Sequence, residues 1–322
     1  MNKALVLLGD DLAGVEDYFK DNMASDAGLI NQVGAHILGS GGKRIRPLLL
    51  MLCARMTGYK GHRHIHLAGA VEFIHTATLL HDDVVDGAAL RRGNPSANSV
   101  WGNQTAVLAG DFLFARAFIM MAENGNLRIL EELSRASCIM AEGEMLQLID
   151  TGNLDIDENA YLNIVGKKTA ALFAATCRCG GILGGVDRQT EEALAGFGTD
   201  IGLAFQLVDD ALDYVAEEAV FGKVPGQDLA EGKVTLPLIH ALQHCSGEES
   251  QLMAGIVANK GLAPIDLEFA LSLIRRTGGI EHSWRKAEEL VLQAKERLEI
   301  FPESAGKEAL LELADYVVTR RQ

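Results

Sequence analysis

Two clusters of aspartate have a spacing that suits the binding of a divalent cation. They are Asp82, Asp83 and Asp86 in HDDVVD, and Asp209, Asp210 and Asp213 in VDDALD. The first and last Asp of each cluster are four residues apart, so on a helix they share one face, where like charges repel. Both clusters lie in apolar sequence, so a bound cation is the natural compensation. Carboxylate oxygens suit Mg²⁺, which commonly bridges one or two carboxylates to a substrate phosphate. The pair of clusters therefore predicts a magnesium-dependent site for a diphosphate.

A solvated acidic turn would explain either cluster by itself. It explains the pair poorly, because each cluster interrupts an apolar helical pattern. A third acidic pair, Asp10 and Asp11, has no such setting, and we assign it to the surface.

Basic residues stand close to both clusters. They are Lys43, Arg44 and Arg46 in GGKRIRP, Arg91 and Arg92 after the first cluster, and Lys223 and Lys233 after the second. In a chain of net charge −15 this placement is informative. Arginine binds phosphate oxygens through two parallel hydrogen bonds, while lysine contributes a point charge. Acids that hold Mg²⁺ and bases that hold diphosphate oxygens form one coherent site.

The elements that carry these residues are predicted to be helices. Apolar residues recur at i, i+3, i+4 and i+7 in AVEFIHTATLLHDDVVD and in DIGLAFQLVDDALDYVA, which is typical of amphipathic helices. No segment alternates with the period of two that a strand needs, so the sequence offers no case for a sheet. No Gly-, Asp-, Ser- or Pro-rich stretch between the predicted helices is long enough to link two domains. We expect an all-α protein with a single domain, residues 1–322.

Composition and charge exclude several classes of function. The net charge of −15 and the pI near 5.0 do not support nucleic-acid binding, which needs a clustered basic face. The apolar run at 4–8 is far too short for a signal peptide or a transmembrane segment, so we expect a cytoplasmic protein. The five cysteines include no CxxC pair, so neither a disulfide framework nor a zinc site is indicated.

Several blocks of the sequence, taken together, resemble a known family. GGKRIRP, LLHDDVVDGAALRRG, GKKTA, FQLVDDALDY and GKVPGQDLAEGKVTLPL look like the ordered signature blocks of the trans-isoprenyl diphosphate synthases, the polyprenyl synthetase family. The resemblance runs from about Leu29 to the C-terminal YVVTRR and is greatest to long-chain, octaprenyl-forming members. It implies a homodimer of an all-α fold, with helices around a deep central cavity and the two Asp-rich helices facing each other across its mouth.

The resemblance also implies roles for individual residues. Asp82, Asp83, Asp86 and Asp209 match the Mg²⁺ ligands, and Asp210 and Asp213 complete the second motif, partly through water. Lys43, Arg46, His75 and Arg92 match residues that bind isopentenyl diphosphate. Arg91, Lys168, Thr169, Gln206, Lys223 and Lys233 match those that bind the allylic diphosphate. The six aspartates, Lys168 and Lys223 are expected to take part in catalysis. Asn94, Pro225 and Gln227 depart from the family pattern and affect loop closure more than chemistry.

The implied reaction is the head-to-tail condensation of isopentenyl diphosphate with an allylic diphosphate such as farnesyl diphosphate. Mg²⁺ and the basic residues would stabilise the departing diphosphate, so catalysis is electrostatic at a preorganised site. The final proton would go to the released diphosphate, so no dedicated base is needed.

Product length is expected to depend on the helix of the first cluster. Thr78 lies four residues before Asp82 and Ala77 five, about one helical turn, or roughly 5 Å, below the metal end. In the resembled family, bulky aromatic residues here close the cavity early, so two small residues imply a long, octaprenyl-like product for a quinone side chain. Both could also be small for packing alone. Candidates for the cavity floor are Phe118, Met121, Met145 and Leu146.

Three alternatives stay open. A short-chain farnesyl or geranylgeranyl diphosphate synthase would share every motif and is disfavoured only by Ala77 and Thr78. A class I terpene cyclase would not need GGKRIRP or the doubled arginine. A non-catalytic partner subunit should have lost at least one Asp cluster or basic block, and here all are present.

Overall fold

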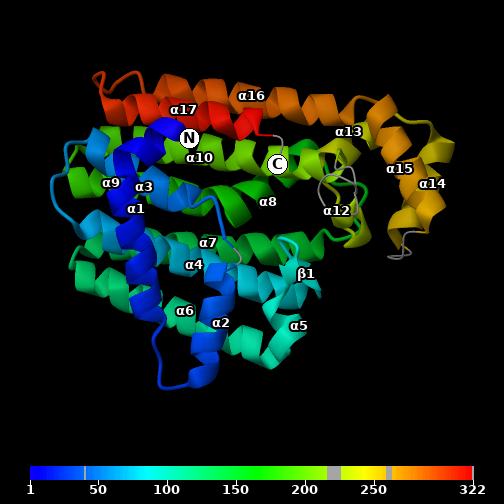
Figure 1. Cartoon of the computed structure of the whole chain (residues 1–322). Helices are drawn as coiled ribbons and strands as arrows, with labels where there is room; N and C mark the ends of the chain where they lie inside the picture. The colour runs from blue at the N-terminus through cyan, green and yellow to red at the C-terminus, as the bar shows by residue number, and fades with distance from the viewer. Residues whose placement is uncertain (40, 216–225, 259–262, 321–322) are drawn as a thin grey trace. The chain divides into compact units, whose positions relative to one another are not determined.

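The computed structural model describes residues 1–39, 41–215, 226–258 and 263–320, and nearly all of them are helical (Figure 1). The predicted all-α fold is confirmed. Backbone contacts divide the chain into two compact units, each made of separate stretches. Unit 1 comprises residues 1–137, 172–195 and 298–313; unit 2 comprises residues 138–171, 196–297 and 314–322. A single domain over residues 1–322 and a central cavity ringed by helices stay predictions.

Unit 1 is built mainly from the N-terminal helices. Its elements are α1 (Asn2–Met23), α2 (Gly28–Gly39), α3 (Ile45–Met56), α4 (Arg63–Val85), α5 (Ala97–Trp101), α6 (Asn103–Asn124), the start of α7 (Leu127–Ile149), most of α9 (Ala171–Gly184), and the first parts of α10 (Arg188–Asp213) and α17 (Ala305–Thr319). In this unit α4 packs along α6 and also contacts α1 and α3 (Figure 1). The helix with the first Asp cluster is thus held on several sides.

The core of unit 1 packs closely against α4. Residues 47–54 of α3 are all buried, as expected of a helix that is apolar on every side. Phe19 of α1 and Phe73 of α4 are fully buried, with ring centroids 4.4 Å apart. Burial of an aromatic side chain contributes about 2–3 kcal/mol. The C-terminal turn of α4, which bears the aspartates, therefore follows a part of the helix that is closely packed in the core.

A small hairpin follows the first Asp cluster, and the sequence did not predict it. β1 (Leu90–Arg91) pairs antiparallel with β2 (Asn94–Pro95). The two residues between them, Arg92 and Gly93, have φ of 52° and 80°, as a type I′ hairpin turn requires. Strands of two residues are too short to show a period-two pattern, which is why none was visible.

Unit 2 contains the remaining helices. They are the end of α7, α8 (Glu158–Val165), a π-helical turn η1 (Gly166–Ala170), the greater part of α10, α12 (Gln227–Ala230), α13 (Leu236–Gln243), α14 (Gly247–Ala258), α15 (Pro264–Arg276), α16 (Gly279–Arg297) and the end of α17. α13 contacts α8, α15 and α16. The Asp157 carboxylate accepts a hydrogen bond from the Ala160 amide at 2.7 Å and caps α8.

The π-helical turn lies within GKKTA, one of the sequence blocks singled out above. π-turns within α-helices are rare and frequently occur at functional sites. The turn carries Lys168 and Thr169, so the local irregularity falls on two residues expected to bind a diphosphate.

One described helix, α6, is long and apolar enough to cross a membrane by length and composition. Its main packing is against α4, and its Arg116 Nε donates to the Asn22 carbonyl of α1 at 3.1 Å.

Candidate active site

A pocket in unit 1 is lined by three of the residues predicted to bind substrate, His75, Arg91 and Arg92, whereas Lys43 and Arg46 are not among its lining residues. Its space of about 560 Å³ is partly open to solvent. Its polar lining consists of His36, Arg44, Glu72, His75, Thr76, Asp83, Arg91, Arg92 and Ser96. His75, Arg91 and Arg92, which lie on different elements, are thus brought to one place. The arrangement suits an anion with several oxygens.

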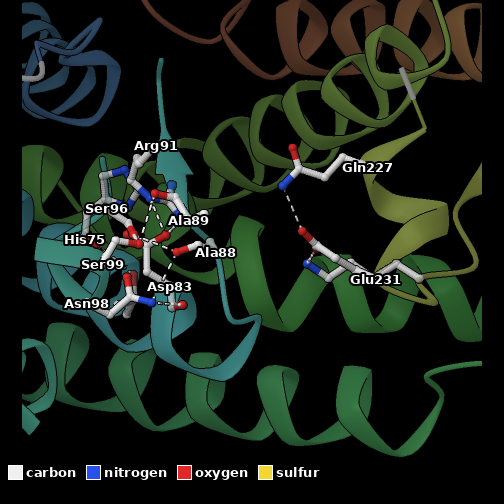
Figure 2. A network of polar contacts seen from close by, with 12 residues as sticks. His75, Asp83, Ala88, Ala89, Arg91, Ser96, Asn98, Ser99, Gln227 and Glu231 are labelled. Carbon is white, nitrogen blue, oxygen red and sulfur yellow. Dashed lines mark hydrogen bonds and ion pairs between the residues drawn. The ribbon is translucent and has the colours of Figure 1, made fainter. Parts of the chain in front are cut away.

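Asp83 of the first cluster is held by Arg91 of the hairpin (Figure 2). Its Oδ1 accepts from Arg91 Nε at 2.7 Å and lies 2.6 Å from a terminal guanidinium nitrogen. The Asp83 carbonyl accepts from Asn98 Nδ2 at 3.1 Å, and Ser96 Oγ donates to the Ala88 carbonyl at 2.6 Å. Asp83 is buried and paired in this way, which favours a role in orienting Arg91; its predicted metal contact stays a prediction.

Asp82 and Asp86 are placed as the spacing predicted. Both are half-buried. Asp82 lies in the last turn of α4, and Asp86 is its C-terminal cap, with its amide donating to the Asp82 carbonyl at 2.8 Å. The two residues therefore lie on one face at the helix end.

The electrostatics of this pocket favour a bound anion. Burial, together with the nearby guanidinium groups of Arg46, Arg92, Arg91 and Arg44, holds the pKa of His75 well below its usual range. A neutral imidazole can donate one hydrogen bond to a diphosphate oxygen without a further charge. Of these guanidinium groups, those of Arg44 and Arg91 already pair with carboxylates, and that of Arg46 stacks on Phe173, 4.4 Å from the ring centroid.

The GGKRIRP segment is shaped by Arg44, which the sequence analysis counted among the basic residues but did not assign to either substrate. Arg44 has φ 49°, a conformation uncommon for a side chain other than glycine. Its guanidinium pairs with Glu16 of α1 at 2.6 Å and with Glu72 of α4 at 2.7 Å. Arg92 donates to the Gly41 carbonyl of the same segment. Lys43 is exposed between these anchors, so the segment is fixed while its lysine faces outward.

A second pocket, in unit 2, brings together the residues predicted for the allylic diphosphate. Its space of about 650 Å³ is partly open to solvent. Its polar lining consists of Gln147, Asp150, Thr151, Tyr161, Lys168, Thr169, Gln206, Asp210, Asp228, Lys233 and Thr235. Lys168, Thr169, Gln206 and Lys233 were all predicted. Lys223 and Pro225 lie outside the described residues, whereas Gln227 is described and donates to Glu231 at 2.9 Å (Figure 2).

Hydrogen bonds link these side chains into a chain that ends on Asp210. Thr169 Oγ1 donates to Gln206 Oε1 at 3.0 Å, and Gln206 Nε2 donates to Asp210 Oδ1 at 2.7 Å. The hydroxyl of the buried Tyr161 donates to Asp210 Oδ2 at 2.5 Å. Both carboxylate oxygens of Asp210 therefore accept protein hydrogen bonds. Asp210 serves here to connect the second Asp cluster to the π-helical turn.

The other two aspartates of the second cluster also have defined neighbours. Asp209 Oδ1 lies 2.8 Å from a guanidinium nitrogen of Arg320, near the C-terminus. Arg320 is buried, stacks on Phe205 and donates to the Phe205 carbonyl at 2.7 Å. Asp213 Oδ2 accepts from the Asp228 amide at 3.1 Å. Tyr161, Arg320 and Asp228 were not predicted, because their partners are far away in the sequence.

Unit 2 concentrates acids whose proton affinity is increased. Burial raises the pKa of Asp210 to about 6, although the hydrogen bonds from Tyr161 and Gln206 oppose the shift and the neighbouring Asp209 and Asp213 add to it. Burial, with Asp213 and Asp210 nearby, also raises the pKa of Asp228 well above its usual range. A cation bound close to these carboxylates would relieve their repulsion.

The raised pKa of Asp210 predicts a specific dependence of stability on pH. Because the folded state binds this proton more tightly than the unfolded state, its stabilising contribution is complete below the ordinary pKa of 3.8 and is lost as the pH rises through about 6. Asp210→Asn cannot ionise, so in metal-free buffer wild type should lose stability relative to the variant across this range, by up to about 3 kcal/mol. Thermal unfolding midpoints between about pH 4 and 7.5 test this. Parallel curves for the two proteins would contradict it.

The donor set fits Mg²⁺. Within unit 1, Asp82 and Asp86 supply hard carboxylate oxygens four residues apart, and within unit 2 Asp209 and Asp213 do the same. In the part of the chain that the structure describes, no three His, Cys, Asp or Glu side chains converge as a complete metal cage. Mg²⁺ does not need such a cage, since it takes few protein ligands and fills its shell with water and substrate phosphate.

The residues proposed to control product length lie outside both pockets. Ala77 is fully buried, whereas Thr78 is half-buried and its hydroxyl donates to the His75 carbonyl at 2.7 Å. Neither lines the unit 1 or the unit 2 pocket. Of the candidate floor residues, Met121 is buried, while Phe118 and Met145 are exposed by 42% and 58%. Their role stays a prediction.

Comparisons with known proteins agree with these features. The sequence profile described as "Polyprenyl synthetase" matches residues 27–274. The octaprenyl diphosphate synthase of Escherichia coli (strain K12) is 43% identical over 320 residues, which cover 99% of each protein. A polyprenyl synthase from Caulobacter crescentus CB15, crystallised with calcium and isoprenyl diphosphate, has a TM-score of 0.96 at 43% identity. The match covers 100% of this chain and 98% of that structure. A decaprenyl diphosphate synthase from Rhodobacter capsulatus has a TM-score of 0.94 at 41% identity, and the match covers 100% of this chain and 99% of that structure.

Proposed function

This chain belongs to the polyprenyl synthetase family and is a prenyltransferase, and we propose that it extends an allylic diphosphate with isopentenyl units to a long, octaprenyl-like all-trans polyprenyl diphosphate. The observation that supports this most directly is that each unit contains a pocket with basic side chains beside an Asp cluster. Two such pockets suit a reaction between two diphosphates. A terpene cyclase, with one diphosphate substrate, needs only one.

The unit 1 pocket is proposed to bind isopentenyl diphosphate. Arg46, Arg92 and the exposed Lys43 supply positive charge, and neutral His75 supplies a hydrogen-bond donor. Because Arg44 forms ion pairs with Glu16 and Glu72, its role is to hold the loop in place, and the neighbouring basic residues bind the diphosphate. Binding here would orient the alkene for attack, and most of the required geometry exists before substrate arrives.

The unit 2 pocket is proposed to bind the allylic diphosphate through Lys168, Thr169, Gln206 and Lys233. Arg91, which lines the unit 1 pocket, and Lys223, which lies outside the described residues, stay predicted contacts of this substrate. The predicted Mg²⁺ ligands are Asp82, Asp83, Asp86 and Asp209, and Mg²⁺ bound by them would supply positive charge to the leaving diphosphate. Asp213 and Asp210 complete the second motif, and Asp210 positions Gln206 through their hydrogen bond. The protein groups act by holding charge where negative charge develops.

In the proposed reaction the allylic C–O bond breaks, and both electrons leave with the diphosphate. The alkene of isopentenyl diphosphate then attacks the allylic cation and forms the new C–C bond. Loss of a proton from the resulting cation, taken by the released diphosphate, restores a double bond and gives a longer allylic diphosphate. The product can enter the same cycle again.

Several finer features belong to the same proposal. Farnesyl diphosphate is the proposed primer, and a quinone side chain is the proposed destination of the product. We also propose a cytoplasmic homodimer. The exposed apolar side chains Leu108, Phe118 and Ile119 on α6 support an interface at this helix, since exposed apolar patches commonly mark contact surfaces.

The test is incubation of the purified protein with Mg²⁺, farnesyl diphosphate and radiolabelled isopentenyl diphosphate, followed by chain-length analysis of the dephosphorylated products. We expect a ladder of products that ends well beyond geranylgeraniol. A stop at farnesol or geranylgeraniol would refute the long-chain proposal but keep the reaction. If no primer supports incorporation, a cyclase or a non-catalytic subunit becomes the better interpretation.

A further inference from the structure

Lys168, in the π-helical turn, is paired with a residue that neither the sequence nor the proposed mechanism uses. Its ammonium lies 2.6 Å from the Glu144 carboxylate of α7. We propose that Glu144 is a positioning residue that holds the Lys168 ammonium in the unit 2 diphosphate pocket before substrate binds. The proposal rests on the proposed function of that pocket.

The pair lies at the pocket and not on the open surface. The Lys168 and Glu144 side chains are exposed by only 22% and 19%, and Lys168 lines the pocket. An ion pair shielded from water is stronger than one in solvent. A lysine ammonium has three N–H donors, so one can stay on Glu144 while the others face a diphosphate.

The residue next to Glu144 brings the two backbones together. A Cβ atom on Gly143 would lie 2.8 Å from Lys168 Cα and would also clash with the Lys168 backbone nitrogen. Only glycine therefore allows α7 to approach the π-helical turn this closely. Two consecutive residues of α7 act on one lysine: Gly143 admits its backbone and Glu144 holds its side chain.

The buried carboxylate of Glu144 reduces the free energy of unfolding, which argues against a role in stability alone. Its Oε1 is buried and has no hydrogen-bond partner within the described chain, and a buried carboxylate oxygen without a partner is unfavourable. Its negative charge also lies beside a pocket for an anion. A residue that served only packing could be neutral. What a carboxylate adds is a fixed place for a flexible cationic side chain, whose ordering is then complete before the substrate arrives.

The chain offers a matched control in the adjacent pair. Lys167, the preceding residue of the same turn, pairs with Glu142 of the same helix at 3.1 Å. The Glu142 side chain is 56% exposed, and Lys167 does not line the pocket. Exposed pairs of this kind contribute little. The two pairs differ in burial and in their relation to the pocket.

Steady-state kinetics of Glu144→Ala, Glu144→Gln and Glu142→Ala, with each substrate varied in turn, test the proposal. Glu144→Ala should raise KM for farnesyl diphosphate about tenfold and leave KM for isopentenyl diphosphate within about twofold. Glu144→Gln should restore only part of the loss, because the amide oxygen still accepts a hydrogen bond from the ammonium but carries no negative charge. Glu142→Ala should match wild type.

A double-mutant cycle with Lys168→Ala separates positioning from a general effect. In the Lys168→Ala background, Glu144→Ala should cause no further loss, because the group it positions is gone. A second, independent loss would overturn the proposal, as would equal increases of both KM values with a lowered unfolding temperature. Unchanged or tighter allylic binding in Glu144→Ala would overturn it as well.

A binding measurement keeps this test distinct from the proposed reaction. Calorimetric titration with inorganic diphosphate and Mg²⁺ should show weaker binding to Glu144→Ala than to wild type or Glu142→Ala. Absence of turnover by wild type with any primer would refute the proposed function, but the difference in diphosphate affinity between Glu144→Ala and wild type could still be measured. Equal diphosphate affinity in all three proteins would refute the positioning role alone.

Discussion

Replacing Asp82 by alanine is expected to reduce kcat at saturating Mg²⁺ by about a thousandfold while the protein stays folded. Asp82 is one of the two half-buried carboxylates on one face at the end of α4, where the Asp86 amide donates to its carbonyl. Without it, the predicted metal site keeps only one of these carboxylates. The backbone bond does not depend on the side chain. Loss of like-charge repulsion should leave the unfolding temperature unchanged or slightly higher.

The measurement is steady-state turnover with both substrates saturating across a range of Mg²⁺ concentrations, with circular dichroism as the check on folding. Asp10→Ala is the matched control, since Asp10 is an exposed residue of an acidic pair outside both pockets. Near-normal activity of Asp82→Ala would remove Asp82 from the set of proposed metal ligands.

Replacing Thr78 by phenylalanine is expected to shorten the product from a long polyprenyl chain to farnesyl or geranylgeranyl diphosphate. Thr78 lies one turn, about 5 Å, before Asp82 on α4 and is half-buried, so an added ring can occupy space where a growing chain would descend. Ala77 is a poorer choice. It is fully buried, and a large side chain there would overpack the core at a cost of about 1–3 kcal/mol.

Product analysis on wild type, Thr78→Phe and Thr78→Val gives the answer. Valine has the shape of threonine and loses only the hydrogen bond to the His75 carbonyl, so its products should match those of wild type. An unchanged ladder from Thr78→Phe would place the determinant of length elsewhere, among residues such as Phe118 or Met121.

The environment of Asp11 shows that the local sequence can be a poor guide to the surroundings of an individual residue. The sequence placed the Asp10–Asp11 pair at the surface, and Asp10 is exposed. Asp11, however, pairs with Arg55 at 2.6 Å and with the buried His64 at 3.0 Å. Its partners are 44 and 53 residues away, and no local pattern indicates them.

What the sequence determined by itself is the helical fold, the two Asp clusters at the ends of helices, and most of the basic residues around two pockets. These depend on local periodicity and on motifs read in order, so they need no knowledge of the tertiary structure. The hairpin at Leu90–Pro95 was missed because strands of two residues have no period.

The tertiary structure alone decided which charges neutralise one another. Arg44 fixes a loop because it meets Glu16 and Glu72, Asp83 faces Arg91, and Lys168 meets Glu144. The energy of a charge depends on its partners and its burial, and both are set by the packing of helices that are distant along the chain. A lysine in a motif can therefore be predicted to bind a diphosphate, but only the folded chain shows which group holds it in place.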